Sequence, residues 1–264
     1  METLKVTLDA RGVAQVQMNR PEVFNAFNEA MIADLGAAFD ELSANPQVRV
    51  IVLSGAGKVF SAGADIQWMK RASEATHDWN LADARQFAQM LHRIAHCGKP
   101  TVARVQGLAL GGGFGLIAAC DLAVAAEEAK FAVSEARFGI LPSVIGPYVV
   151  NAVGARQAKR LALTASRIGA ADALQMGLVH EVVPAAELDA SVERWIAELL
   201  LNGPQAQTEI KHLFAQLAVG PVTAEVVELT AQTIARVRMT PEAKEGFGAF
   251  LDKRAAAWTR SEKS

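Results

Sequence analysis

Two stretches of small residues could present backbone N–H groups to a negatively charged oxygen. The first, Gly107–Asp121, reads GLALGGGFGLIAACD and leads from an apolar strand-like segment into an apolar helical run. The second, Val59–Ile66, reads VFSAGADI and follows the strand-like run RVIVL. A helix N-terminus carries unpaired N–H groups and a positive partial charge, and glycine lets a ligand oxygen approach them closely. Two such segments that converge on one oxygen would form an oxyanion hole, although the first alone is equally consistent with a tight packing turn.

The segments that must position these stretches alternate between strands and helices. Leu4–Leu8 and Val13–Met18 alternate around a short turn, which predicts a β-hairpin. Asn28 is placed to cap a helix that ends before Pro46. Further strands are expected at residues 49–53, 122–125 and 131–133. Another is expected over residues 101–105, in an apolar segment that is interpreted as a strand ending at Gly107.

Strand patterns disappear from about Ala185 onward. Helical patterns fill the rest of the chain, with breaks at Gly203-Pro204, Gly220-Pro221 and Thr240-Pro241. This change predicts an α/β core over residues 1–185 and a helical C-terminal region over residues 186–264. Periodicity alone does not distinguish a doubly wound sheet from a spiral of ββα units.

The composition narrows the classes of function. The 264 residues carry a net charge of −2, which gives no basic surface for nucleic acid or an anionic membrane. Cys97 and Cys120 offer no disulfide framework, so buried thiols are expected. No apolar run reaches membrane-spanning length and the N-terminus lacks a secretory pattern, so a cytoplasmic protein without membrane contact is expected.

Six motifs in one order resemble the crotonase (enoyl-CoA hydratase/isomerase) superfamily over essentially the whole chain. They are NRPEVFNAF from Asn19, FSAGADI from Phe60, GLALGGGFGLIAACDLAVA from Gly107, FAVSEARFGILP from Phe131, AADALQMGLVHEVV from Ala170 and FGAFLDKRAAAW from Phe247. The resemblance implies a ClpP-like spiral of ββα repeats with a helical C-terminal region. It also implies a trimer or hexamer, an acyl-CoA thioester substrate, and no cofactor apart from the coenzyme A of that substrate.

The resemblance also implies the site. The backbone N–H groups of Ala64 and Gly112 should hold the thioester oxygen, and Glu135 matches the second glutamate of hydratases in the family. Segments that meet coenzyme A and the acyl chain in the family contain Asn25, Ala26, Lys58, Ser61, Ala62, Asp65, Ile66, Trp68, Gly111 and Tyr148. Phe250, Lys253 and Arg254 match a C-terminal helix that reaches coenzyme A in a neighbouring subunit. For Lys58 and Lys253, a solvated surface charge is the alternative reading.

Two departures from the family pattern leave the reaction open. Gly115 stands where hydratases have their first glutamate, so the two-glutamate hydration mechanism lacks one carboxylate. Residues 143–148, SVIGPY, replace the usual glycine-rich run and resemble a bacterial branch assigned to methylglutaconyl-CoA and related branched enoyl-CoA hydration. The branch favours a hydratase, whereas the single glutamate favours a Δ3,Δ2-enoyl-CoA isomerase. A third possibility is a non-catalytic acyl-CoA-binding homologue.

Other polar residues are weaker candidates for a site. His92 and His96 share a helix face but have no third metal ligand nearby, and Ser61 and Ser134 lack a His/Asp arrangement for nucleophilic catalysis. Asp65 and Asp121 are expected to be structural. Between the two oxyanion segments, residues 67–81 are polar and could wall the acyl pocket or form an ordinary helix–loop. Within them, Glu74 and Asp78 could replace the missing carboxylate.

Overall fold

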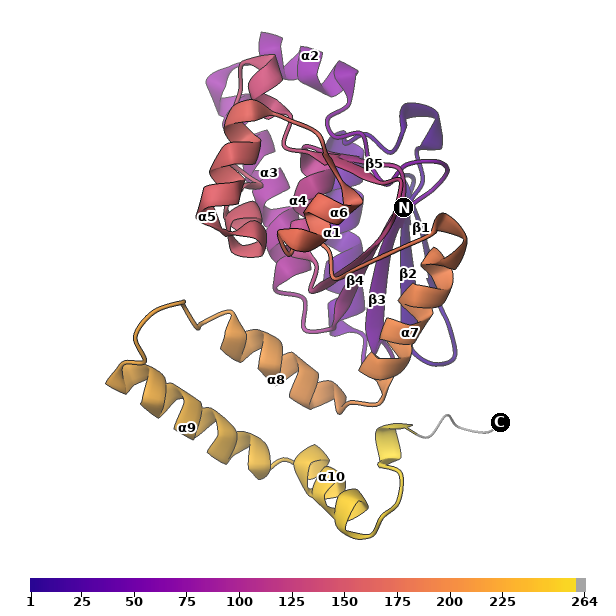
Figure 1. Cartoon of the computed structure of the whole chain (residues 1–264), viewed down its shortest axis with the longest axis vertical. Coiled ribbons are helices and arrows are strands. Elements are labelled where there is room, and N and C mark those ends of the chain that lie inside the picture. The colour runs from indigo at the N-terminus through magenta and orange to yellow at the C-terminus, as the bar shows by residue number, and fades with distance from the viewer. Residues whose placement is uncertain (260–264) are drawn as a thin grey trace.

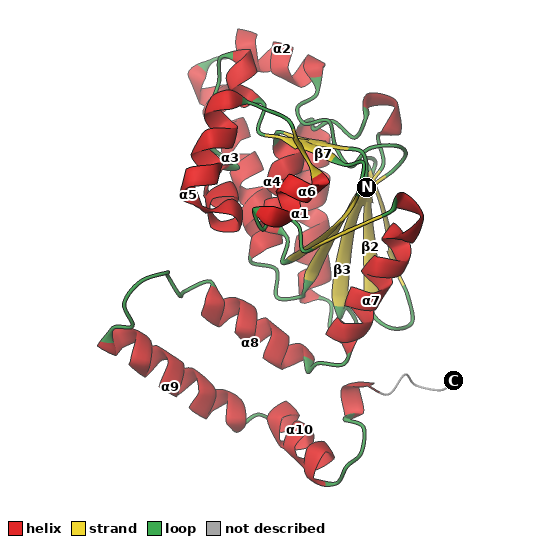
Figure 2. Cartoon of the chain, viewed as in Figure 1, coloured by secondary structure: helices red, strands yellow, loops and turns green. Residues whose placement is uncertain are grey.

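The computed structural model describes residues 1–259 and contains two β-sheets flanked by helices (Figures 1 and 2). The larger sheet has the strand order β1-β2-β3-β4-β6-β9. Its first two strands pair antiparallel as the expected hairpin, and the remaining pairs are parallel. The bounds of its strands are β1 Leu4–Leu8, β2 Val13–Met18, β3 Val50–Gly55, β4 Thr101–Val105, β6 Leu122–Ala126 and β9 Glu181–Val183.

A second, three-stranded sheet has the order β5-β7-β8, formed by Leu108–Leu110, Lys130–Ala132 and Ile168–Gly169. Successive turns of the chain place one strand in each sheet, β4 before β5 and β6 before β7, which is the expected ββα spiral. The sequence predicts that one strand ends at Gly107, whereas β4 ends at Val105 and a new strand begins at Leu108. The chain changes sheets at Gly107, where φ is +62° and a Cβ atom would lie 2.2 Å from the Lys58 carbonyl oxygen.

The main hydrophobic core lies between the larger sheet and helices α1 (Glu29–Ala44), α3 (His77–Ala95), α4 (Gly112–Ala119) and α5 (Gly146–Thr164). Asn28 caps α1 as predicted, since its side chain accepts a hydrogen bond from the Met31 N–H. Helix α4 is apolar on nearly every side and almost wholly buried. Its N-terminus is therefore fixed by packing from several directions.

Residues 67–81 fall in a helix–loop–helix rather than in an irregular segment. Helix α2 (Ile66–Glu74) has no buried residue and lies at the end of the molecule opposite α10 (Figure 1). Its side chains Trp68 and Met69 nevertheless line a cavity described below, so both sequence readings of this segment apply in part.

The C-terminal third of the chain is helical, as predicted. Helix α7 (Leu188–Leu200) follows α6 (Ala170–Gln175) and β9, and it packs on the larger sheet through a second hydrophobic cluster. Helices α8 (Pro204–Phe214), α9 (Ala224–Arg238) and α10 (Pro241–Leu251) stand away from the sheets (Figure 1). The domain boundary at residue 185 stays a prediction, because α7 belongs to the packing of the core.

A few polar contacts connect the C-terminal region, which contains α8, α9 and α10, to the core. Arg49 donates to the carbonyl oxygens of Asn202 and Trp258 at 2.9 and 3.2 Å. Lys211 on α8 pairs with Asp121 at 2.5 Å. Asp121 also accepts the Thr101 N–H, so its predicted structural role is confirmed. Within residues 1–259, no helix is long and apolar enough to cross a membrane.

Candidate active site

A cavity of about 810 Å³ lies between α2, α3 and the segment that follows β7. Both stretches singled out in the sequence reach it, since Ala64 and the Gly111–Gly112 pair line its wall together with Glu135. The remaining wall is largely apolar and aromatic. This combination of a concave apolar surface with few polar groups is typical of a small-molecule site.

The Ala64 N–H is held at a turn that the surrounding backbone fixes. Phe27 donates its N–H to the Gly63 carbonyl at 2.7 Å and accepts the Asp65 N–H at 2.8 Å. Gly63 has a φ of +92°, which favours glycine. Within residues 1–259, the N–H groups of Ala64 and Gly112 have no backbone or side-chain acceptor. Both donors are therefore free to bind a ligand oxygen.

The second donor lies at the first residue of α4. Gly111 adopts a φ of +50° and donates its N–H to the Ala132 carbonyl at 2.9 Å. A Cβ atom at Gly112 would lie 3.1 Å from ring carbons of both Phe27 and Phe87. Two glycines are thus needed here, one for the turn and one for the close approach of the aromatic rings.

Glu135 begins the short 3-10 turn Glu135–Phe138 that follows β7, beside the glycine turn. Its Oε1 lies 3.4 Å from the place where a Cβ atom of Gly111 would be. Its Oε2 is buried and has no hydrogen-bond partner within residues 1–259. Burial raises the pKa of Glu135, and nearby backbone N–H groups oppose this only in part. A buried carboxyl group with a free oxygen and a raised pKa is suited to general acid/base catalysis.

The space beside Gly115 is filled by Ile145. A Cβ atom at position 115 would lie 2.3 Å from Cγ2 of Ile145, which is almost fully buried between α4 and α5. No carboxylate can extend from this position without displacing Ile145. The space that the side chain of a glutamate at position 115 would need is therefore filled by Ile145.

Three aromatic side chains, Phe27, Trp68 and Phe87, form part of the cavity wall. The ring of Phe87 lies 5.8 Å from that of Phe27 and 6.2 Å, edge-on, from that of Trp68. The indole N–H of Trp68 donates to Oδ1 of Asp83 at 3.1 Å. Asp83 also lines the cavity, and burial raises its pKa above the ordinary value.

The sequence reading missed Asp83. Asp83 lies four residues before Phe87 on the same face of α3, but only the packing of Phe87 on the glycine turn shows that this face meets the cavity. Glu74 and Asp78, suggested instead, do not line the cavity, and the Asp78 side chain is 99% exposed. The hypothesis that either replaces the missing glutamate is therefore not supported.

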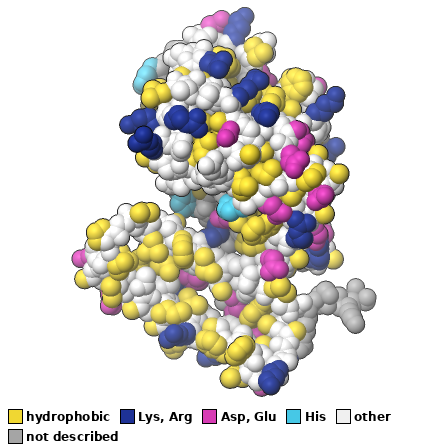
Figure 3. All heavy atoms as spheres, in the orientation of Figure 1, with side chains coloured by type: hydrophobic (Ala, Val, Ile, Leu, Met, Phe, Trp, Pro, Cys, Tyr) yellow, Lys and Arg dark blue, Asp and Glu magenta, His cyan; other side chains and the backbone are white. Residues whose placement is uncertain are grey.

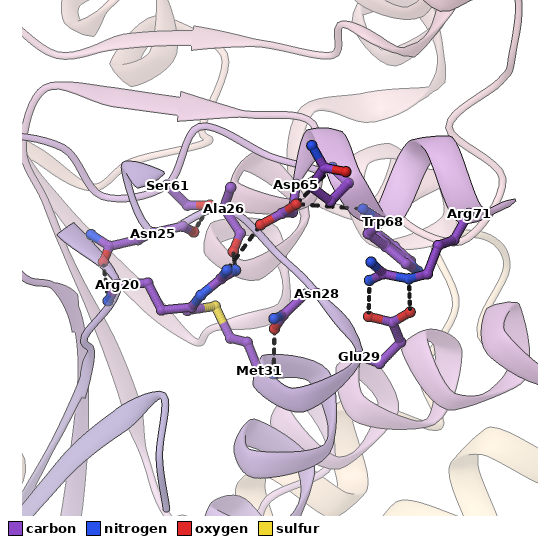
Figure 4. Close-up of polar contacts among 11 residues, drawn as sticks. Arg20, Asn25, Ala26, Asn28, Glu29, Met31, Ser61, Asp65, Trp68 and Arg71 are labelled. Atoms are coloured by element: carbon purple, nitrogen blue, oxygen red, sulfur yellow. Dashed lines mark hydrogen bonds and ion pairs between the residues drawn. The ribbon is translucent and has the colours of Figure 1, made fainter. Parts of the chain in front are cut away.

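A network behind the Ala64 turn involves several predicted binding residues (Figure 4). Asn25 is fully buried, and its amide nitrogen donates to the carbonyls of Ala56 and Val59. Ser61 is also fully buried and donates to the Asn25 carbonyl at 2.8 Å. The side chains of Asn25 and Ser61 therefore shape the turn rather than face the cavity.

Asp65 links this network to α2. It accepts the N–H groups of Gln67 and Trp68 as the N-cap of α2 and pairs with Arg20 at 2.9 Å. Burial raises the pKa of Asp65, but Arg20 and the backbone donors outweigh it and hold the pKa below its usual value. Arg20, which also donates to the Ala26 carbonyl, is a positioning residue that the sequence reading did not name.

The other predicted binding residues lie at different depths. Ala62, Trp68 and Gly111 line the cavity, whereas Lys58, Ile66 and Tyr148 do not. Tyr148 packs against the core, and Ile66 is 79% exposed. Phe250 and Lys253 are exposed at the end of α10, at the opposite end of the molecule from α2 (Figure 1). One chain therefore does not bring these two residues to its own cavity.

The histidine pair and the cysteines carry no site. The rings of His92 and His96 stack at 3.9 Å, and no group of three metal-ligating side chains exists within residues 1–259. Cys97 is buried and Cys120 half-buried, and burial raises the pKa of Cys120 to about 12. Both thiols are structural, as expected.

Comparison with known proteins decides the family. A family model described as enoyl-CoA hydratase/isomerase matches residues 9–261. The chain belongs to this family. The predictions of a crotonase-superfamily enzyme and of its α/β fold are thereby confirmed.

Individual members of the enoyl-CoA hydratase/isomerase family resemble the chain over almost its whole length. An enoyl-CoA hydratase crystal structure from Shewanella pealeana is 39% identical, with a TM-score of 0.94 over 97% of this chain and 96% of that one. Pseudomonas aeruginosa AtuE is 35% identical, with a TM-score of 0.93 over 98% and 100%. A crotonyl-CoA hydratase from Syntrophomonas wolfei is 33% identical over 92% of this chain and 93% of its own length.

Proposed function

We propose that the chain is a hydro-lyase that adds water to a short or branched enoyl-CoA thioester, with Glu135 as general acid/base. One observation carries this proposal. The buried, unpartnered Oε2 of Glu135 shares a cavity with the two free N–H groups of Ala64 and Gly112. Relatives named enoyl-CoA or crotonyl-CoA hydratase support the reaction class.

The two N–H donors stabilise the charge that the reaction develops. Attack of water at C3 moves electrons through C2 onto the thioester oxygen, which becomes enolate-like. Fixed N–H dipoles in a site that excludes water stabilise that oxygen, and one donor is typically worth about 3–4 kcal/mol. Glu135, whose pKa is raised by burial, supplies the proton that forms the new C2–H bond.

The charged side chains of the cavity support an acyl group with a second carboxylate, such as methylglutaconyl. Arg137 and Arg167 line the cavity, and neither pairs with a carboxylate of residues 1–259. Among residues 1–259, Arg137 donates only to the Ala165 carbonyl, at 3.2 Å. An arginine without an acidic partner is suited to binding a ligand carboxylate. The apolar wall around Val144 and Ile145 would hold the methyl branch.

The assembly and the coenzyme A site are part of the same proposal. Hydrophobic side chains are exposed on helices α8, α9 and α10 (Figure 3), including Ile210, Phe214, Ile234 and Phe250. Burial of this surface in a trimer or hexamer would bring Phe250 and Lys253 to a neighbouring subunit's coenzyme A. Lys58 would then contact its phosphates, in a cytoplasmic enzyme that needs no further cofactor.

One observation favours an isomerase as the second candidate. Ile145 fills the space of the missing glutamate, which leaves Glu135 without the partner that family hydratases use. A single carboxylate could remove a C2 proton and return it at C4 while the N–H groups hold the dienolate.

Turnover of a small panel tests the proposal. The enzyme is mixed separately with crotonyl-CoA, 3-methylglutaconyl-CoA and a 3-enoyl-CoA, and the masses of the products are measured by mass spectrometry. A gain of one water from a 2-enoyl-CoA supports the hydratase. A 3-enoyl-CoA converted at constant mass, without hydration, supports the isomerase. Binding without turnover of any substrate would favour the non-catalytic homologue.

A further inference from the structure

Asp83 and Glu135 are the only acidic side chains of residues 1–259 that line the cavity. They come from different elements, Asp83 from α3 and Glu135 from the turn after β7. No ion pair involves either of them within the described part of the chain. The cavity therefore holds two carboxylates, although the position of the family's first glutamate is a glycine.

The packing of α3 brings Asp83 near the glycine turn. Phe87 lies one helical turn after Asp83 on the same face, and its ring atom lies 3.1 Å from the Cβ position of Gly112. Oε1 of Glu135 lies 3.4 Å from the Cβ position of the adjacent Gly111. Asp83 therefore lies one helical turn, about 5 Å along the helix axis, from Phe87, which packs on the N–H donor Gly112.

Trp68 fixes the orientation of this carboxylate. Its indole N–H occupies Oδ1 of Asp83, and the edge-on contact with Phe87 fixes the indole itself. One oxygen of Asp83 is thereby held, and the carboxylate keeps further acceptor capacity for a water molecule in the cavity.

We propose that Asp83 is the second catalytic carboxylate, which takes a proton from the attacking water while Glu135 protonates C2. This inference rests on the proposed hydratase function. In the step, a water O–H bond breaks and its proton passes to Asp83 as the C3–O bond forms. The electron pair of the C2=C3 bond takes the proton of Glu135 and forms the C2–H bond. Proton exchange with solvent returns Asp83 to the carboxylate and Glu135 to the acid, so that the net change is addition of one water.

Two activities separate the roles of the two carboxylates. Hydration of crotonyl-CoA needs both, whereas exchange of the C2 protons of butyryl-CoA in deuterium oxide needs only Glu135 and the oxyanion hole. Asp83→Asn keeps an acceptor for the Trp68 N–H but removes the base. We expect it to lower kcat for hydration by about 100-fold or more and to leave C2 exchange within about threefold of wild type. Glu135→Gln should lose both activities.

Matched variants guard against an effect on folding alone. Asp83→Glu restores a carboxylate and should recover part of the hydration rate, and Trp68→Phe removes the indole donor but keeps the base, so it should cost less than tenfold. Asp78→Asn, on the same helix but outside the cavity, should be unchanged. Hydration at the wild-type rate by Asp83→Asn, or equal loss of hydration and exchange, would overturn the inference. A wild-type enzyme that neither hydrates nor exchanges would instead contradict the proposed function.

Discussion

Ile145 occupies the space into which any side chain at Gly115 would extend, with Cγ2 2.3 Å from the Cβ position. In an open helix, Gly→Ala stabilises by roughly 0.5–1 kcal/mol because alanine loses less backbone entropy. Here we expect Gly115→Ala to destabilise by about 1–3 kcal/mol, since the core around α4 is already filled. Thermal unfolding of Gly115→Ala, Ile145→Ala and the double variant tests this. Additive losses, with no relief of Gly115→Ala by the shortened neighbour, would contradict the contact.

Loss of the Asp65–Arg20 pair should lower catalytic activity, whereas loss of an ion pair on the surface should not. Asp65→Ala removes the N-cap of α2, which costs about 1 kcal/mol, and leaves the mostly buried Arg20 unpaired behind the Ala64 turn. We expect both a lower free energy of unfolding and a lower kcat. Glu29→Gln breaks the exposed pair with Arg71 (Figure 4) and should change neither the free energy of unfolding nor kcat appreciably. Equal kcat losses in the two variants would refute the positioning role.

The unpaired arginines of the cavity predict substrate preference. Arg137→Gln should lower kcat/KM for 3-methylglutaconyl-CoA by about 10-fold or more, since a charged hydrogen bond is worth about 1.5–3 kcal/mol. The value for crotonyl-CoA, which has no second carboxylate, should change little. Arg156→Gln, an exposed arginine outside the cavity, is the control. An equal loss of kcat/KM for both substrates would contradict a role of Arg137 in binding the second carboxylate.

The raised pKa of Glu135 predicts how stability depends on pH. A carboxyl group whose pKa is raised by folding is best accommodated in its protonated form, and that stabilisation is lost as pH rises through the folded-state pKa. Glu135→Gln, which stays neutral, should match the melting temperature of wild type at pH 4 and exceed it at pH 8. Thermal unfolding of both proteins at both pH values checks this, and a wild type with a higher melting temperature than Glu135→Gln at pH 8 would contradict it.

Much of the fold could be predicted from local sequence patterns, and where the prediction was wrong the reason is physical. The hairpin, the Asn28 cap and the loss of strands after residue 185 follow from short-range chemistry, and all are observed. The sequence predicts a strand end at Gly107 but not the new strand that begins at Leu108, because the tripeptide LAL continues the apolar run of the previous strand. Only the contact with the Lys58 carbonyl, distant in sequence, shows why the chain must turn there.

The site was predictable where motif and backbone coincide. Ala64, Gly112 and Glu135 were found because the small residues and the glutamate stand at strand ends. Asp83 was not, since a single aspartate on an amphipathic helix has no local signal and enters the site only through packing against Trp68 and Phe87. The buried roles of Asn25 and Ser61 likewise depend on contacts between separate segments.

The most direct test of the central claim compares binding with turnover in Glu135→Gln. Affinity for a saturated acyl-CoA is measured by titration calorimetry, and kcat for crotonyl-CoA is measured on the same preparation. If Glu135 transfers the proton while Ala64 and Gly112 hold the oxygen, Kd should stay within about threefold and kcat should fall by about 100-fold or more. A variant that keeps its turnover, or that loses binding and turnover together, would contradict this role of Glu135.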